Sequence, residues 1–421
     1  MVRSVVIGTF MAGLCFGLAG NAVADDRVSA SKKGSLLFYS KVELQYELIN
    51  EAFVLTRDTF IDIANDYTDD VWVQLYYING DPPTPRITVG DPPVVVERAH
   101  PGWNNVDCQM RLTANQPAYF AASTGLPGPA APGTGGCQPF TILDPGFPPG
   151  RPNPDFASLA RRTLRGYIVG WAVNVHGEEI RWNHLKGDAV IIDYDGGTAW
   201  EYNAYAFAAI SANHGAQSDG QPGLLLMDGV EYDYGFDKLV LDFFASGSLA
   251  LSGILGVVVD TDLTLHPITA DLRQDTLGPI CTKAHFDIWN EMEARFSGTT
   301  KCICCWDQTL LSNYPAENHF LLPNLHTNKG KARIDGVAST ECDFFTVNAS
   351  LLGLAAKQLT FFNAATVTGL AEAGMTLVGQ GAESGAIAYD IIEPSDELTN
   401  GGLDVSTPSV GDVKPAVRTP R

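Results

Sequence analysis

The chain has 421 residues and a formal charge of −21, because 48 acidic side chains stand against 27 lysines and arginines. Such an excess of negative charge opposes binding to nucleic acids and to anionic lipid surfaces. The length exceeds what one ordinary core needs and predicts two domains.

Residues 1–24 have the three parts of a secretory signal peptide. Arg3 gives the positive start, residues 5–19 form a short apolar run, and Ala22 and Ala24 provide small residues before the cleavage site. An uncleaved anchor and lipid attachment at Cys15 are the alternatives. No later stretch approaches about 18 apolar residues. We therefore expect a secreted chain at the extracellular cell surface, with no membrane span once mature.

The rest of the chain has the composition of strands. Residues 34–48 and 58–79 are rich in Val, Ile, Phe, Tyr and Trp, with a polar turn at residues 65–70 between two runs of the second stretch. Further strands are expected over residues 164–175, 189–194, 198–210, 238–245 and 256–265. Residues 351–359 fit a short helix or a strand. The pattern predicts an all-β fold made of two tandem antiparallel β-sandwich domains, and it resembles bacterial cell-surface proteins with immunoglobulin-like modules.

Two short internal matches favour related halves. Residues 62–66 match residues 287–291, and residues 168–172 resemble residues 334–338, in the same order. Chance similarity is the alternative. We predict a first domain over residues 27–262, a second over 263–393, and a disordered tail over 394–421, where polar residues prevail.

A Gly/Pro-rich insertion interrupts the first predicted domain. Residues 125–152 contain 15 glycines or prolines among 28 residues, too many for a regular strand ladder. We expect a surface loop, either an interaction arm or a simple decoration. Cys137 lies within it, so a disulfide to Cys108 would tether the loop.

Disulfides are expected because an exported chain meets an oxidising compartment. Cys108 and Cys137 form one expected pair, and Cys281 and Cys342 are each expected to pair within the group Cys302, Cys304 and Cys305. The odd count leaves one thiol over. A metal or redox site formed by that group with His285 or His319 is the alternative.

Acidic turns are the candidate calcium sites, because calcium is held by several carboxylate and carbonyl oxygens. The candidates are Asp193, Asp195, Asp228, Glu231 and Asp233. None of these segments matches a twelve-residue calcium loop, and a solvated turn is the alternative for each.

Trp200 and Tyr202 alternate with polar residues, so both belong to one face of a strand. If the two rings are exposed, they could stack on a sugar. If they are buried, they belong to the core of a sandwich.

No serine-hydrolase elbow, zinc-protease helix or phosphate-binding loop is present in the sequence, and we expect no enzyme activity. The leading hypothesis is a structural or assembly protein of the cell exterior, such as a surface-layer or filament subunit. It would associate with itself or with other surface components, with calcium damping the charge repulsion. The alternative is a soluble extracellular binding module for carbohydrate or another surface protein. A metalloprotein centred on Cys302 and its neighbours comes third.

Overall fold

The computed structural model describes most of the chain between residues 33 and 381. The described residues are 33–80, 105–126, 137, 161–210, 214–215, 227, 232, 235–251, 255–268, 281–296, 299–304, 306–314, 318–337, 339, 342, 350–363 and 366–381, with short strands at 28–29, 87–88, 94–95 and 151–152. The predicted signal peptide, the tail after residue 393 and most of the Gly/Pro-rich insertion lie outside them.

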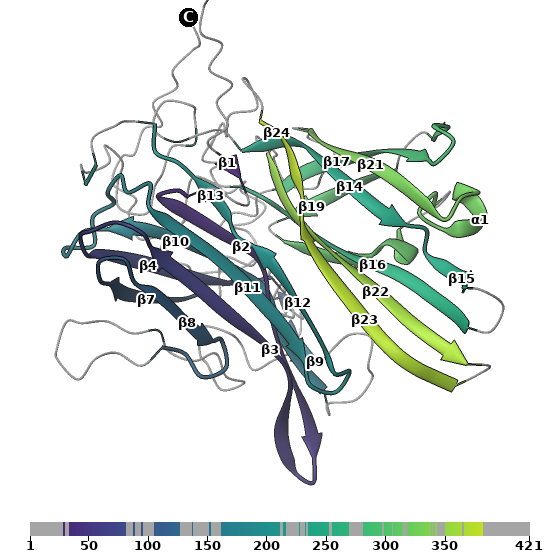
Figure 1. Ribbon diagram of the computed structural model, residues 1–421, viewed down its shortest axis with the longest axis horizontal. Helices are drawn as coiled ribbons and strands as arrows, with labels where there is room; N and C mark the ends of the chain where they lie inside the picture. The colour runs from purple at the N-terminus through teal and green to yellow at the C-terminus, as the bar shows by residue number, and fades with distance from the viewer. Residues whose placement is uncertain are drawn as a thin grey trace, which may run out of the picture.

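Antiparallel strands make up nearly all of this structure, which confirms the predicted all-β class (Figure 1). The helical elements of the described residues are one short helix, α1 (Leu322–Leu325), and one 3₁₀ turn, η2 (Leu311–Asn313). Residues 351–359, for which the sequence left helix or strand open, belong to strand β22. The tandem immunoglobulin-like arrangement stays a prediction.

The first half of the chain forms one long sheet in the order β12-β11-β3-β2-β10-β4-β7. Its strands are β1 (Val28–Ser29), β2 (Leu36–Ile49), β3 (Ala52–Asn65), β4 (Val71–Asn79), β7 (Asn105–Leu112), β8 (Pro117–Ala121), β9 (Arg151–Pro152), β10 (Arg161–Val173), β11 (Leu185–Asp193), β12 (Thr198–Asn203) and β13 (Tyr205–Phe207). A separate pair joins β5 (Ile87–Thr88) to β6 (Val94–Val95).

The second half forms two sheets, in the orders β18-β17-β21-β14-β24 and β15-β16-β22-β23. Its strands are β14 (Phe236–Phe244), β15 (Gly247–Leu251), β16 (Leu255–Pro267), β17 (Cys281–Asn290), β18 (Arg295–Phe296), β19 (Thr300–Cys304), β20 (Asp307–Leu310), β21 (Lys329–Val337), β22 (Leu351–Asn363), β23 (Thr366–Thr376) and β24 (Val378–Gly381).

Strand pairing in the two halves follows the same order. The path β2-β10-β4-β7 corresponds to β14-β21-β17-β19, and β12-β11-β3-β8 corresponds to β23-β22-β16-β20. The predicted match of residues 168–172 to 334–338 agrees with this alignment, because it places β10 on β21. The match of 62–66 to 287–291 does not, because it places β3 on β17 instead of β16.

A repeated hydrogen-bond arrangement supports the pairing of β3 with β16. Asp58 of β3 accepts the backbone N–H groups of Thr59 at 2.8 Å and Ser123 at 3.3 Å, and also the Ser123 hydroxyl. Asp260 of β16 accepts the N–H groups of Thr261 at 2.8 Å and Ser312 at 3.3 Å, and also the Ser312 hydroxyl. Ser123 follows β8, which pairs with β3, and Ser312 follows β20, which pairs with β16. In each half the aspartate therefore binds the residues just after the neighbouring strand and holds the end of that strand in place.

The domain boundary predicted near Asp262 falls inside β16, whose partners are β15, β20 and β22. The change of strand partners occurs earlier, between the end of β13 at Phe207 and the start of β14 at Phe236. Strands β14, β15 and β16 therefore pair within the second half, which the local sequence did not signal because both halves have the same strand-rich composition.

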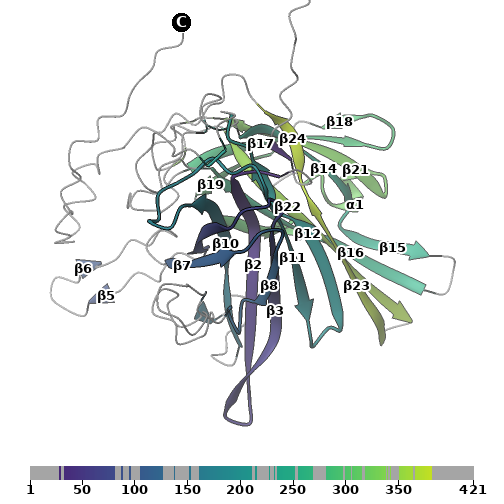
Figure 2. The same ribbon diagram turned by 60° about the vertical axis from the view of Figure 1, so that its left-hand side comes forward.

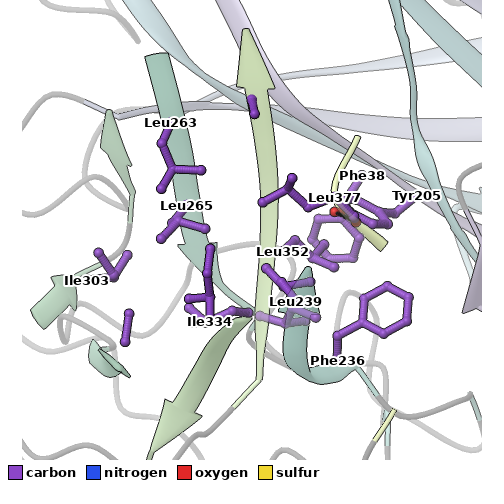
Figure 3. Packing of buried hydrophobic residues seen from close by; sticks show 14 of the residues in the cluster. Phe38, Tyr205, Phe236, Leu239, Leu263, Leu265, Ile303, Ile334, Leu352 and Leu377 are labelled. Atoms are coloured by element: carbon purple, nitrogen blue, oxygen red, sulfur yellow. Dashed lines mark hydrogen bonds between the residues drawn. The ribbon is translucent and has the colours of Figure 1, made fainter. Parts of the chain in front are cut away.

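Among the described residues, two apolar cores each contain side chains from both halves. One consists mainly of first-half residues together with Leu354 and Ala356 of β22, and the other is divided between the halves. The second joins Leu239, Leu352 and Leu377 of the second half to Phe38 and Tyr205 of the first. Figure 3 shows Phe38 and Tyr205 next to Leu377 and Leu352. The Tyr205 hydroxyl donates to the carbonyl of Gly353 at 2.7 Å, so its polar group is satisfied inside this core. The two halves are therefore packed as one body.

Candidate functional site

The β2–β3 hairpin extends away from the body of the molecule in both views (Figures 1 and 2). Its tip turns through Asn50 and Glu51, whose φ angles of 50° and 67° are both left-handed, as in the two-residue turns that match the twist of a hairpin. Four apolar side chains surround the turn and are exposed, at 44% for Leu48, 45% for Ile49, 37% for Phe53 and 43% for Val54. We call these four residues the hairpin tip.

The hairpin tip was not predicted from the sequence. The sequence of residues 34–48 predicts an ordinary strand. Its alternation does not show that β2 and β3 extend beyond the sandwich, which buries only the first part of β2 and the last part of β3. The burial pattern of β3 shows this change, from exposed residues at Ala52–Val54 to alternating buried residues after Leu55. Clustered exposed apolar residues on a soluble protein mark contact surfaces.

A groove of about 460 Å³ lies at the base of this hairpin, a size typical of ligand and partner sites. Its lining includes Leu55, Asp58, Phe60, Tyr119 and Tyr194. Burial raises the pKa of Asp58, against the hydrogen bonds from Ser123 and Thr59 that lower it. A partner that contacts the hairpin from this side would also cover the groove.

Trp200 and Trp306 each pack against a glycine of the opposite half, at the junction between the halves. A Cβ atom on Gly374 of β23 would lie 2.1 Å from the Trp200 ring, and one on Gly80 would lie 2.4 Å from the Trp306 ring. Only glycine permits such close approach of a ring to the backbone. The Trp306 indole N–H also donates to the Ser40 carbonyl at 3.0 Å, which fixes the ring at the junction.

A buried charge network crosses the same junction. Lys41 of β2 is 2% exposed, and its ammonium lies 2.6 Å from Asp262 of β16 and 3.4 Å from Glu43. Arg57 contacts Glu43 at 2.9 Å and also Asp193. Burial alone would lower the pKa of Lys41, but Asp262 and Glu43 outweigh it and hold that pKa above its usual value.

Glu43 is ionised for the corresponding reason. Burial would raise the pKa of Glu43, but Lys41, Arg57 and Arg165 outweigh it and lower the pKa to about 2. The network around Lys41 and Glu43 therefore consists of ionised side chains inside the protein. It joins the halves and offers no open face to a substrate.

Trp200 and Tyr202, the predicted ligand-binding pair, are both buried. They share one face of β12, as the alternation predicted, but that face points into the core, where the Tyr202 hydroxyl donates to the Lys41 carbonyl. Neither ring can stack on a sugar, so the assignment of these two residues to a carbohydrate site is wrong.

The described residues include three disulfides, and each joins cysteines that were expected to pair. Cys108 is bonded to Cys137, Cys281 to Cys304, and Cys302 to Cys342. The Cys281–Cys304 bond joins directly paired residues of β17 and β19. Cys305, the seventh cysteine of the predicted mature chain, lies outside the described residues. With Cys302 and Cys304 both bonded, the alternative metal or redox site at this group loses two of its thiolates.

Of the five calcium candidates, the structure describes Asp193 and Asp195. Asp193 accepts the Gly196 N–H at 2.6 Å and pairs with Arg57, so its oxygens are already engaged. Asp195 lies exposed in the turn between β11 and β12. Asp228, Glu231 and Asp233 lie outside the described residues. Within the part of the chain that the structure describes, no three His, Cys, Asp or Glu residues are grouped in a way that would hold a metal ion.

Comparisons with known proteins identify no family. No family model and no curated protein matches the chain. Among solved structures, one similar chain comes from "Cryo-EM Atomic Structure of Broad Bean Stain Virus (BBSV)", at 10% identity and a TM-score of 0.17, covering 89% of this chain and 98% of that one. Another comes from "Crystal structure of the CupB6 tip adhesin from Pseudomonas aeruginosa", at 10% identity and a TM-score of 0.11, covering 83% and 92%. Scores this low carry no argument about fold or function.

A search of the described helices for one long and apolar enough to cross a bilayer finds none.

Proposed function

We propose that this chain is an exported structural protein that assembles with further copies of itself at the cell exterior. The observation that carries the proposal is the hairpin tip. Four exposed apolar side chains at the end of a long projecting hairpin are costly to leave in water, and contact with another protein would bury them. The halves behind the hairpin are joined by a shared core and a buried charge network, so the body is suited to bear a fixed contact.

Export and calcium dependence belong to the same proposal. The signal-like residues 1–24 and the three disulfides are consistent with an oxidising exterior. Divalent cations would damp the repulsion between copies that each carry a formal charge of −21. The alternative is a soluble extracellular binding module for carbohydrate or another surface protein, and burial of Trp200 and Tyr202 removes the two residues that favoured its carbohydrate form.

Replacement of Ile49 and Phe53 by threonine tests the proposal. Threonine keeps the strand preference of both positions but removes apolar surface worth about 2 kcal/mol when buried, so the critical concentration for assembly should rise at least about tenfold. Sedimentation velocity and negative-stain electron microscopy of residues 25–421, with and without millimolar calcium, measure this.

The matched control replaces Val258 and Val367 by threonine, because both are exposed valines on strands of the second half. The control should assemble like the wild type. Wild-type protein that stays monomeric at every concentration and calcium level would contradict the proposal.

A further inference from the structure

The outer face of β14, β17 and β21 is cationic and partly apolar, on a chain with 48 acids and 27 basic residues. Along these strands the buried residues alternate with outward-pointing ones. The outward positions, with Arg295 of β18, supply six cations: Lys238, Lys283, Arg295, Lys329, Lys331 and Arg333. Four aspartates belong to the same strands: Asp237, Asp242, Asp287 and Asp335. Along these strands the cations exceed the aspartates by two, against the balance of the whole chain, and we call this surface the basic face. Ion pairs join Lys238 to Asp237, Lys331 to Asp242 and Arg333 to Asp335, and the exposed Glu291 and Glu293 lie at its end in the β17–β18 turn.

Trp289 lies at the middle of the cationic cluster. The guanidinium groups of Arg295 and Arg333 lie 5.8 and 5.9 Å from the centre of its ring, and both donate to the buried Asp287 at 2.8 Å. Beside them, the directly paired Val240 and Val378 are exposed. The basic face therefore offers two oriented arginines and a tryptophan next to exposed valines, and aromatic residues and arginine are enriched in protein contact surfaces.

The first half carries the complementary surface on the outer side of β8, β3, β11 and β12. Asp62 and Asp188 are directly opposite each other on β3 and β11, and Glu201 of β12 points outward beside them. Like charges directly opposite each other destabilise a sheet. Tyr119 of β8, paired with Asp62, is 75% exposed. We call this surface the acidic face; among its outward positions Lys186 of β11 supplies a cation.

The pKa values of Asp62 and Asp188 both lie above the usual range of an aspartate. Burial raises the pKa of Asp62, and the charge of Asp188 raises it further; burial also raises the pKa of Asp188, with Glu201 adding to that increase. Lys186 offsets part of the effect at both carboxyls. Additional cations placed over this face would stabilise both carboxylates.

We propose that the acidic face of one copy binds the basic face of the next, head to tail. This inference rests on the proposed assembly function and names its contact surfaces. The two faces belong to different halves of one body, so the contact is heterologous, and repeated contacts of this kind form an open chain of copies unless the rotation closes a ring. A second copy is the partner that the charges favour, because one chain carries both complementary surfaces.

The size of the acidic face explains why the hairpin tip is needed as well. Strand β11 has 9 residues and therefore runs about 30 Å, and four strands span roughly 15–20 Å. The flat area is roughly 500 Å², below the about 800 Å² that each partner buries in a standard interface. Charge complementarity fixes orientation more than it adds affinity. The apolar tip is expected to supply the remaining contact area.

Ionic strength gives this contact a distinctive signature. At about 10 mM salt the screening length is roughly 30 Å, so the net repulsion of two acidic copies acts over the whole molecule. At about 1 M it is roughly 3 Å, and the facing charges no longer attract. Assembly should therefore be strongest near about 0.1 M. An interface held by apolar contacts alone would instead strengthen steadily with salt.

Charge reversal tests the pairing of the faces. One variant carries Asp188→Lys and Glu201→Lys; the other carries Lys329→Glu and Lys331→Glu; the hairpin tip is intact in both. Each variant alone should lose assembly at 0.1 M salt by at least about tenfold in critical concentration. An equimolar mixture should recover assembly, because the reversed acidic face of the first variant meets the reversed basic face of the second.

Two controls carry equal changes of net charge elsewhere: Lys33→Glu with Arg111→Glu, and Asp69→Lys with Asp107→Lys. Both controls should assemble like the wild type, and circular dichroism should show that every variant is folded.

The pairing of faces is overturned, while the assembly function stands, if the wild type assembles and the reversed variants assemble equally well. The same conclusion follows if a mixture of folded variants fails to recover assembly. A wild type that never assembles overturns both.

Discussion

Lys41 and Glu43 show how a single residue can determine the stability of the junction between the halves. Both are buried. Lys41 depends on Asp262 and Glu43 for its charge, and Glu43 depends on Lys41, Arg57 and Arg165. A buried ion pair adds little compared with an apolar pair, but removing one partner leaves a buried charge without compensation. These positions are therefore sensitive to substitution, although the sequence around them has no feature that distinguishes them from surface residues.

The pH dependence of stability should carry the signature of Glu43. Its folded pKa of about 2 lies below the ordinary glutamate pKa of 4.5, so its contribution is fully present above about pH 4.5 and is lost as the pH falls toward 2. The shift corresponds to a contribution on the order of 3 kcal/mol. Urea unfolding of the wild type and of Glu43→Gln at pH 7, 4.5 and 2.5 measures it. The difference between the two proteins should shrink over the last interval; a constant difference would contradict the assignment.

At the scale of elements, the contact between β12 and β23 depends on Gly374 of β23, because any side chain at this position would overlap the Trp200 ring. Replacement of Gly374 by alanine places a methyl group 2.1 Å from that ring and should cost about 1–3 kcal/mol. Gly369 is the matched control on the same strand, because the nearest atom to its added Cβ is in the Phe361 ring at 3.9 Å. Alanine there should be neutral or slightly stabilising. Thermal unfolding followed by tryptophan fluorescence compares the two; equal losses would contradict the close approach.

The same pair of strands shows where sequence reasoning stops. The alternation at Trp200 and Tyr202 was enough to predict a strand with both rings on one face. Which side of that strand is buried depends on β23, which lies far along the chain and has no local link to β12. For the disulfides, the sequence predicted that Cys281 and Cys342 each pair within the group Cys302, Cys304 and Cys305, but it left open which partner each takes. The boundary predicted near Asp262 falls inside β16, because the composition of that strand is alike whichever half contains it.

At the scale of the whole molecule, the shared core predicts one cooperative unit. The core that contains Phe38 and Tyr205 also contains Leu239 and Leu352, so unfolding either half exposes apolar surface of the other. Calorimetry should show one transition whose van't Hoff and calorimetric enthalpies agree, and near-ultraviolet dichroism should follow the same midpoint. Two separated transitions would show that the halves unfold independently. Class of fold and overall strand content were accessible from composition, whereas this fusion of the halves depends on contacts between distant strands.

The chain segment between Leu126 and Cys137 begins and ends at neighbouring, paired residues. Leu126 and Cys137 exchange two backbone hydrogen bonds of 2.8 Å, and the bond from Cys137 to Cys108 ties the same point to β7. The two ends of the intervening segment are therefore fixed to the sandwich whatever its length. Lengthening a closed loop costs only about 0.6 kcal/mol per doubling. The segment between them is thus the position at which evolution or an engineer can insert new sequence, such as an epitope or a tag, while leaving the sandwich intact.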